Sequence, residues 1–504
     1  MNQVKTGIIL NYIILGLNTF LGLIYTPYML RCLGQNEYGV YSLVASIIAY
    51  LTILDLGFGS AIVRFTAKFK AEGKTNEQWE MFGMFLCIYT IIGLLAFLGG
   101  YILYLNVDNL FERTMTPSDL SQAQTMMIFL IVNLAITFPL SIFGSIVTAY
   151  EDFAFLKIVQ IIRILLCTGT LVLLLYWGYK AIAMVIVQTV FNIATLIINT
   201  LYCFLKLKIK VWFRGFNWIL IKEITTYSFW MFLNAVMDKI YWGTGQFVLG
   251  AISGTIAVAI YSIGITLQGM YMLFSTSISN VLLPRVTEMI SKNRTTTEIS
   301  NLFISTGRIQ AIVMFLILSG FTVFGKGFIH LWAGEDYAQS YYITLIFFGA
   351  LFIPLIQNVG VTILQARNQL KFRSICYLII SFLSLILQFA LAKSFGAIGC
   401  AIAVGSALLI GQGFIMNIYY DRNQGLNINK FWREILQLSI TPLLLTAIGL
   451  ISRHFIDFTV PATLLGSIFI FALFYCVLMY KFGMNDYEKN LIRRPIMRVW
   501  DKIK

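Results

Sequence analysis

The sequence predicts an all-α protein that crosses a membrane many times. Of its 504 residues, 59% are hydrophobic and 12% are charged, whereas soluble domains carry about 25% charged residues. Mean hydropathy is +0.82. Apolar stretches of about 20 residues, the length that a spanning helix needs, recur along the whole chain. These observations predict about fourteen transmembrane helices.

The first span follows a short polar N-terminus. The apolar stretch 7–30 is longer than the core of a signal peptide and has no small-residue cleavage site, so we expect it to remain as a helix. The same window predicts further spans at 39–63, 81–105, 122–148, 157–176, 181–205, 224–250, 255–281, 300–324, 340–364, 373–392, 398–420, 435–452 and 461–482.

The basic residues predict the orientation. The N-terminus and every second connection are rich in Lys and Arg, most clearly at 64–74, 206–222 and 481–504. The other connections hold one cation each: Arg31, Arg113, Lys180, Lys326, Lys393 and Arg453. By the positive-inside rule, both termini are cytoplasmic in a bacterial cytoplasmic membrane. The net charge of +14 then reflects topology and anionic lipid, not nucleic acid.

Cysteine and histidine usage argues against metal and redox chemistry. The seven cysteines are scattered singly, without a C-x-x-C pair, and are read as small hydrophobic residues. Both histidines, His330 and His454, fall after spans and leave no intramembrane proton relay of that type. We expect no cofactor and no enzymatic activity. The sequence does not exclude a coupling cation.

Matched residues indicate an internal repeat. Asn18 and Asn234 are 216 residues apart (234 − 18), as are Tyr25 and Tyr241 (241 − 25). Three further pairs follow in chain order: Arg64 with Arg285 (offset 221), Pro139 with Pro354 (215) and Gly178 with Gly396 (218). Two six-helix halves would explain these offsets. The halves would be parallel, because each has an even number of spans.

The repeat predicts four regions. They are an N-terminal six-helix lobe at 1–215, a pseudo-symmetric C-terminal lobe at 216–430, an accessory helix pair at 431–482 and a basic amphipathic tail at 483–504 that lies on the inner leaflet.

The span 224–250 carries Asp238 and Lys239 at its middle. An Asp or Lys at the centre of a spanning helix costs roughly 2.5–3.5 kcal/mol, so both should face protein or water. One helical face, with its border, holds the polar and aromatic set Tyr227, Trp230, Asn234, Asp238, Lys239, Tyr241, Trp242, Gly245 and Gln246. This face either binds a substrate or is satisfied by neighbouring helices and fixes their packing.

Other intramembrane polar residues join the candidate site. Asn18 and Tyr25 occupy the matching face of the first span. Arg163 is a second cation that either serves the cavity or snorkels to the inner surface. Asp55 is expected to be a structural or gating partner for a cytoplasmic-side cation, Arg64 or Arg285.

Two stretches near the N-terminus have a recognisable pattern. They read Tyr25-x-Pro27-x-x-x-Arg31-x-Leu33-Gly34-x-x-Glu37-Tyr38-Gly39-Val40-Tyr41 and Leu54-Asp55-Leu56-Gly57-x-Gly59-x-Ala61-x-x-Arg64. Later landmarks are Ile260-Tyr261-Ser262, Leu283-Pro284-Arg285, Leu331-Trp332-x-Gly334-Glu335-x-Tyr337 and Leu364-Gln365-Ala366. In this order they resemble bacterial polysaccharide-biosynthesis flippases, which serve O-antigen, capsule or exopolysaccharide assembly, of the multidrug/oligosaccharidyl-lipid/polysaccharide superfamily.

The resemblance implies a two-lobed fold with a V-shaped, alternating-access cavity. It implies that the substrate is a polyprenyl-diphosphate-linked oligosaccharide, carried from the inner to the outer leaflet, with membrane lipids and the polysaccharide polymerase machinery as further partners. Lys239 and Arg163 could meet the diphosphate, aromatic faces could stack on sugar rings, and Asn or Gln could bond hydroxyl groups.

Three other classes of protein are weighed against a flippase. A cation-coupled multidrug exporter is the main alternative, although the first span offers Asn11 and Asn18 and no carboxylate. A membrane glycosyltransferase or polymerase would need acid/base groups outside the bilayer, and the longest outer connection, 106–121, is short. A channel would need a filter-like segment, which the dispersed glycines do not provide.

Overall fold

The computed structural model describes residues 3–55, 57–213, 218–292, 294–367, 369–491 and Arg493. Within α1, α8 and α9 it leaves the side chains of 3–5, 7, 8, 219, 220, 223, 224, 226–231, 234, 280–285, 287 and 291 undescribed. The described residues form helices and no strand. The all-α class predicted from composition is therefore confirmed.

Contacts group the chain into two compact units. Unit 1 comprises 1–262 with 392–397, and unit 2 comprises 263–391 with 398–504. The helix α8 and the start of α9 thus belong to unit 1. The grouping follows packing, not sequence repetition, so the repeat boundary at 215 stays a prediction.

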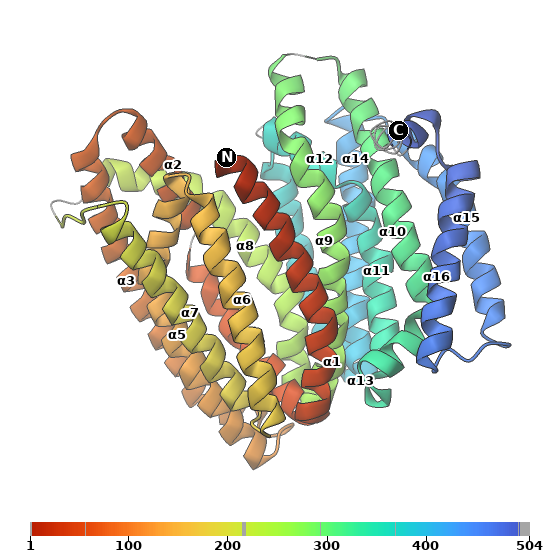
Figure 1. Cartoon of the computed structure of the whole chain (residues 1–504), viewed down its shortest axis with the longest axis horizontal. Helices are drawn as coiled ribbons and strands as arrows, with labels where there is room; N and C mark the ends of the chain where they lie inside the picture. The colour runs from red at the N-terminus through yellow and green to blue at the C-terminus, as the bar shows by residue number, and fades with distance from the viewer. Residues whose placement is uncertain are drawn as a thin grey trace, which may run out of the picture. The chain divides into compact units, whose positions relative to one another are not determined.

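The helices of unit 1 run largely side by side (Figure 1). They are α1 (Gln3–Leu51), the 3-10 turn η1 (Thr52–Asp55), α2 (Phe58–Ala71), α3 (Thr75–Leu105), α4 (Val107–Phe111), α5 (Pro117–Ala149), α6 (Phe153–Tyr176), α7 (Ala181–Leu205) and α8 (Trp218–Ile252), followed by the first turns of α9 (Thr255–Ser291). Within this unit α5 packs between α3 and α7, and α1 contacts both α6 and α8.

Unit 2 is built around α10. Its helices are the rest of α9, α10 (Thr296–Trp332), the 3-10 turn η2 (Glu335–Tyr337), α11 (Ser340–Ile356), α12 (Asn358–Ala366), α13 (Lys371–Leu408), the π-helical η3 (Leu409–Ile415), α14 (Met416–Arg422), α15 (Ile428–Ser452), α16 (Pro461–Leu478) and the π-helical η4 (Met479–Gly483). The helix α10 packs against α11, α15 and α16.

Ten described segments are long and apolar enough to cross a membrane, and a bent pair formed by α11 and α12 makes eleven. Two of the ten, Ile9–Ala71 and Lys371–Arg422, have 63 and 52 residues. As straight helices they would be about 95 and 78 Å long, far more than a hydrocarbon core of about 30 Å. Each is broken by a non-helical glycine, Gly34 or Gly396. The predicted spans lie on either side of these glycines, and the total of fourteen stays a prediction.

Positive backbone φ angles recur at matched positions. Gly34 and Gly254 have φ of 75° and 83° and are 220 residues apart (254 − 34). Gly178 and Gly396 have φ of 84° and 54° and are 218 residues apart (396 − 178). This region of φ favours glycine because it has no Cβ. The two spacings differ by two residues and are close to the offsets of the predicted repeat, which stays a prediction.

The reversal at Gly34 is followed by two polar residues that organise one end of unit 1. The Glu37 carboxylate accepts a hydrogen bond from the first amide of α7, that of Ala181, at 2.9 Å. It also forms an ion pair with Lys180 at 3.2 Å. The Asn36 amide donates to Asp119 at the start of α5 at 2.7 Å, and its oxygen accepts from Thr255 at the start of α9. Free amides at helix starts need such partners.

Gly39 belongs to the same arrangement and lies where there is no room for a side chain. A Cβ there would overlap the backbone of Thr255, with the carbonyl carbon at 2.7 Å. The pattern Gly34-x-Asn36-Glu37-x-Gly39 therefore has a structural reason: one chain reversal joins the first turns of three helices.

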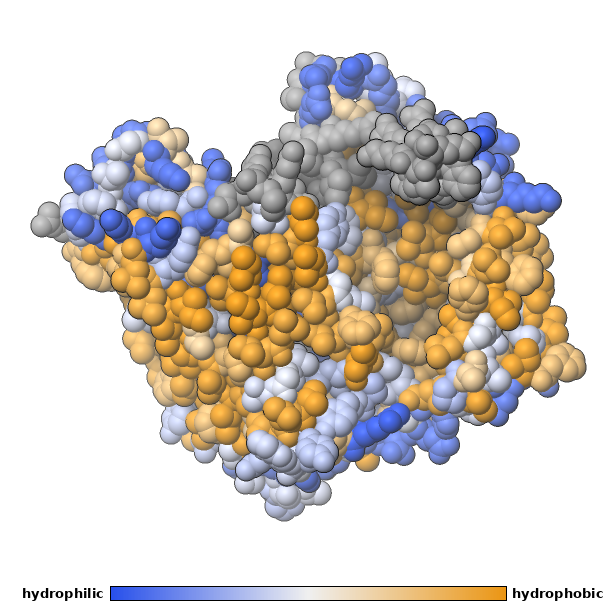
Figure 2. All heavy atoms as spheres, in the orientation of Figure 1, coloured by the Kyte–Doolittle hydropathy of each residue, from blue (hydrophilic) through white to orange (hydrophobic). Residues whose placement is uncertain are grey.

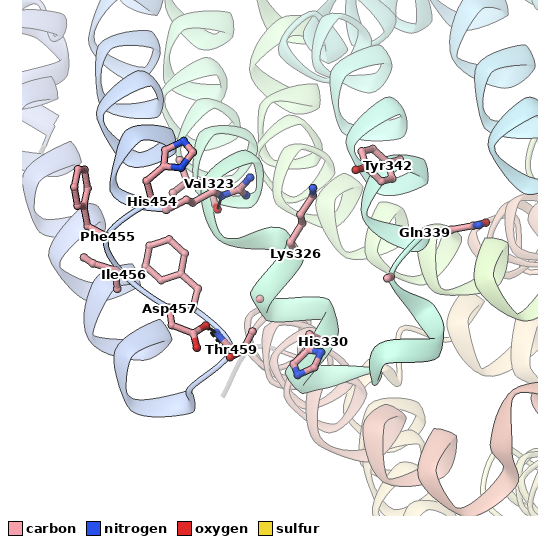
Figure 3. Close-up of a pocket in the computed structure, with 14 residues that line it drawn as sticks. Val323, Lys326, His330, Gln339, Tyr342, His454, Phe455, Ile456, Asp457 and Thr459 are labelled. Atoms are coloured by element: carbon pink, nitrogen blue, oxygen red, sulfur yellow. Dashed lines mark hydrogen bonds between the residues drawn. The ribbon is translucent and has the colours of Figure 1, made fainter.

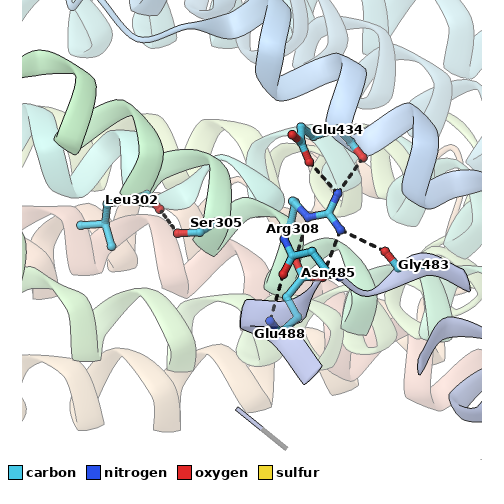
Figure 4. Close-up of polar contacts among 7 residues, drawn as sticks. All are labelled: Leu302, Ser305, Arg308, Glu434, Gly483, Asn485 and Glu488. Carbon is cyan, nitrogen blue, oxygen red and sulfur yellow. Dashed lines mark hydrogen bonds and ion pairs between the residues drawn. The ribbon is translucent and has the colours of Figure 1, made fainter. Parts of the chain in front are cut away.

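A buried ion cluster joins the C-terminal residues to α10 (Figure 4). The Arg308 side chain is 6% exposed, and its Nε and Nη2 donate to both oxygens of Glu488 at 2.7 and 3.0 Å. Its Nη1 donates to the carboxylate of Glu434 at 2.8 Å, and Nη2 also donates to the Gly483 carbonyl at 3.0 Å. We call this set the Arg308 cluster.

The surface agrees with a membrane protein. Figure 2 shows a broad hydrophobic belt over the sides of the helices and hydrophilic residues at their ends. Large apolar side chains such as Leu94, Leu166, Ile386 and Leu443 are more than half exposed on these sides. Contact with lipid tails accounts for this exposure. The basic tail predicted at 483–504 lies outside the described residues from 494 onward.

Candidate functional site

The predicted polar face lies on α8, in unit 1. Asp238 is exposed there, and Lys239 is half-buried. The side chains of Tyr227, Trp230 and Asn234 lie outside the described residues. The two charged residues are adjacent, so their side chains leave the helix about 100° apart and need separate surroundings.

The C-terminal half of this face is tightly packed. Tyr241 is 1% exposed, and its ring lies 5.9 Å from that of the half-buried Trp242. Gln246 donates to the Ser262 hydroxyl of α9 at 2.8 Å. Gly245 lies against the Tyr261 ring, which a Cβ would meet at 2.5 Å. In this conformation Gln246 and Gly245 hold α8 to α9 and Tyr241 is buried, and substrate contact by Tyr241 or Gln246 stays a prediction.

Further along the chain, α8 packs against the second arm of α1. Gly243 lies against the Tyr50 ring, and Gly250 lies against Leu43. Lys239 is one helical turn before Gly243. These two glycines allow the close approach of α8 to α1, and Lys239, four residues before Gly243, lies on the same face of α8.

The first arm of α1 carries the second polar face. Asn18 is exposed. One end of this face is fixed by Lys157 of α6, whose ammonium donates to the Asn11 side-chain oxygen at 2.9 Å. At the other end the half-buried Tyr25 hydroxyl lies 4.0 Å from the sulfur of Met184 on α7. Asn11 is thus bound by a cation in this conformation.

Arg163 is half-buried on α6, one helical turn from Cys167. Cys167 lies within electrostatic range of Arg163 and of the hydroxyls of Tyr25 and Tyr41. Cys167 is therefore near Arg163 and near two tyrosines of α1.

Sequence reasoning missed a polar ladder on α7. Gln188 and the Tyr41 hydroxyl are hydrogen-bonded at 3.0 Å. One turn further, the Asn192 amide donates to Asn133 and to Thr137 on α5, both at 2.8 Å. Gln188 and Asn192 are four residues apart, a spacing that could have revealed one face. Buried amides of this kind fix helix packing when satisfied.

The residues predicted to have a structural or gating role have different surroundings. The Tyr89 hydroxyl donates to Asp55 at 2.8 Å, and the backbone of Gly57 adds a second hydrogen bond. Arg64 is exposed, with its guanidinium 5.9 Å from the Phe65 ring. The Arg285 side chain lies outside the described residues. Pairing of Asp55 with either arginine stays a prediction.

Taken together, α1, α6 and α8 place cations, tyrosines and amides on apolar helices of one unit. Cations in a low-dielectric setting attract anionic groups, and aromatic and amide groups suit a sugar. These side chains form the candidate site of unit 1, in a chain whose described residues include ten segments long and apolar enough to cross a membrane.

Comparison with known proteins identifies the family. Residues 4–290, more than half of the chain, match the family described as "Polysaccharide biosynthesis protein". The chain therefore belongs to this family of flippases. A protein of Shigella flexneri described as "Putative O-antigen transporter" is 20% identical over 407 residues, which are 78% of this chain and 92% of that protein.

Two solved structures share the fold. The lipid II flippase MurJ in an inward closed conformation gives a TM-score of 0.73 at 16% identity, over 96% of this chain and 100% of that one. An inward-facing multidrug transporter of the MATE family gives 0.59 at 12% identity, over 83% and 96%. The superfamily recognised in the sequence is confirmed. At these identities the structures show the fold alone.

Proposed function

We propose that this protein translocates a polyprenyl-diphosphate-linked oligosaccharide repeat unit from the inner to the outer leaflet by alternating access, in cell-surface polysaccharide biosynthesis. The protein is a transporter rather than an enzyme. The supporting observation is the set of cations, tyrosines and amides on α1, α6 and α8 in a chain of the polysaccharide biosynthesis family.

Arg163 is the strongest candidate for the diphosphate. It lies ten residues after the start of α6 (163 − 153), which is about 15 Å along the axis. That is near the middle of a hydrocarbon core of about 30 Å. A purely snorkelling arginine would be expected closer to the interface. The half-buried Lys239 of α8 is the second candidate.

The proposed location is a bacterial cytoplasmic membrane with both termini in the cytoplasm. This orientation rests on the distribution of Lys and Arg between alternate connections. The substrate would enter from the cytoplasmic leaflet, where the lipid-linked unit would be completed.

The alternative is a cation-coupled exporter of small molecules, because MATE transporters share the fold. An exporter of that kind would use a membrane carboxylate to bind the coupling ion, and Asp55 and Asp238 are the candidates on α1–α8. The two functions predict that transport depends on different side chains. Diphosphate binding requires the cations, whereas ion coupling requires the carboxylates.

The test is complementation of a flippase-deficient strain, normalised to the amount of protein in the membrane. Arg163→Gln and Lys239→Gln should lose activity, and Lys239→Arg should keep part of it because the charge remains. Lys74→Gln is the matched control, since Lys74 is exposed and pairs with the exposed Glu72 at 2.7 Å. Full activity in both Gln variants would overturn the proposed site. Drug export without complementation would favour the alternative.

A further inference from the structure

Unit 2 contains a cavity of about 830 Å³ (Figure 3). It lies where α10 ends, between the start of α11 and the connection from α15 to α16. Figure 3 shows Lys326 of α10 between Gln339 and Tyr342 on one side and the connection residues His454 to Asp457 on the other. We call this cavity the basic pocket.

Glycines of α10 let the connection approach. A Cβ on Gly327 would meet the Phe458 side chain at 2.9 Å, and one on Gly325 would meet the Tyr341 ring at 3.0 Å. Phe458 is buried and packs edge to face on Phe324, with ring centres 5.0 Å apart. The wall of the pocket is therefore fixed by packing.

Arg453 is bound by neutral groups. Its Nε donates to the Val323 carbonyl at 2.6 Å, and its Nη2 donates to the Thr322 carbonyl at 2.7 Å. Its guanidinium also lies 5.9 Å from the Tyr341 ring. Carbonyls and a ring orient this cation but do not neutralise its charge.

Lys326 is also held by rings. Its ammonium lies 5.6 and 5.3 Å from the ring centres of Tyr341 and Tyr342. Among the described residues, no carboxylate is recorded within ion-pair distance of Lys326 or of Arg453. Both cations thus keep their charge available at the cavity.

One carboxylate lines the pocket. Asp457 accepts from the Thr459 amide at 2.8 Å and from the Thr459 hydroxyl at 2.7 Å. These two hydrogen bonds hold the pKa of Asp457 below its usual range, so it is ionised at neutral pH. With Lys326 and Arg453 the fixed charge is +1 (2 − 1). His330, whose Nδ1 is 3.6 Å from Glu335, and His454 add neutral or positive groups.

The surroundings indicate a lipid as the source of an anion. Phe455 is 83% exposed on the connection, and Ile456 is 40% exposed beside it. Tyr342 is 46% exposed at the rim. Apolar and aromatic side chains of this kind, next to cations at the ends of spanning helices, are typical of the membrane interface.

We propose that the basic pocket binds the phosphate of an anionic membrane lipid, with Lys326 and Arg453 as its cations and the apolar connection against the acyl chains. By the predicted orientation this is the outer leaflet. The site does not depend on which substrate is transported. It would hold a lipid at the junction between α10 and the C-terminal helix pair.

The test is native mass spectrometry of the full-length protein in detergent with added phosphatidylglycerol or phosphatidylcholine. One basic residue at a membrane surface contributes enough that Lys326→Gln should weaken phosphatidylglycerol binding about fivefold. Lys393→Gln, an exposed single cation predicted on the same side, should leave it unchanged. Lys326 has no described hydrogen bond, so folding should be retained, as thermal unfolding would verify.

Each outcome of these measurements either supports or overturns the proposal. Weaker phosphatidylglycerol binding in Lys326→Gln only, with little binding of phosphatidylcholine, supports the proposal. Equal binding of the two lipids, or no effect of Lys326→Gln, overturns it. Inorganic phosphate is the third probe. If it binds as tightly as phosphatidylglycerol and displaces the lipid, the anion site stands but the lipid assignment is wrong.

Discussion

Replacing Glu488 by Gln should destabilise unit 2 by about 3 kcal/mol. The Glu488 side chain is 3% exposed and holds Arg308 through two hydrogen bonds of 2.7 and 3.0 Å. A neutral amide offers one acceptor and no charge. Removing one partner of a buried ion pair costs about 3–5 kcal/mol, because a charge stays buried. Glu434 remains as a partner of Arg308, at 2.8 Å and 31% exposed. We therefore expect a loss of stability at the lower end of this range.

The assay is reversible unfolding in mixed micelles, with the free energy of unfolding compared between variants. The matched control is Glu298→Gln on α10, the helix that carries Arg308. Glu298 pairs with Arg294 at 3.4 Å, with both side chains about half exposed. Gln also preserves the capping box with Thr295. Exposed pairs of this type contribute about 0.3–0.5 kcal/mol.

A double variant separates pairing from packing. Arg308→Gln with Glu488→Gln removes both charges, so its loss should be smaller than the sum of the two single losses. The reasoning is refuted if Glu488→Gln costs no more than Glu298→Gln.

The Arg308 cluster also bears on the C-terminal helix pair, which the sequence predicts to be accessory. A chain ending at Asn429 loses both Glu434 and Glu488, and with them Phe431, which packs against Gly307 and Phe303. We expect such a chain to insert but to unfold more readily than one ending at residue 491, measured by thermal unfolding in detergent. Equal stability of the two chains would show that the cluster does not anchor this region.

Three further predictions concern unit 1. In a background without native cysteines, a cysteine at Lys70 should resist labelling from outside the cell and one at Asp108 should react; the reverse pattern would invert the topology. Asp238→Asn keeps shape and hydrogen bonding, so lost transport at normal protein level would show that the charge matters, whereas unchanged transport would make it dispensable. Gly39→Ala should cost about 1–3 kcal/mol by forcing its methyl group into the backbone of α9, while Gly169→Ala, in open space, should not; equal unfolding midpoints would disprove the tight contact.

Much of the fold could be read from the sequence because the bilayer restricts the choices. A lipid environment leaves helices as the way to satisfy the backbone, so runs of apolar residues give the helices and their approximate ends. The reversals at Gly34 and Gly396 fall between predicted spans for the same reason. The order of short motifs was enough to indicate the flippase superfamily.

Tertiary structure decided what each polar residue does, because a single face of a helix does not reveal its neighbours. Tyr241, a predicted cavity residue, is buried in this conformation, and Asn11 is bound by Lys157 from a helix 146 residues away. The Arg308 cluster joins residues 180 apart in sequence. Burial, pairing and the free charge of the basic pocket depend on such distant contacts, which local periodicity cannot encode.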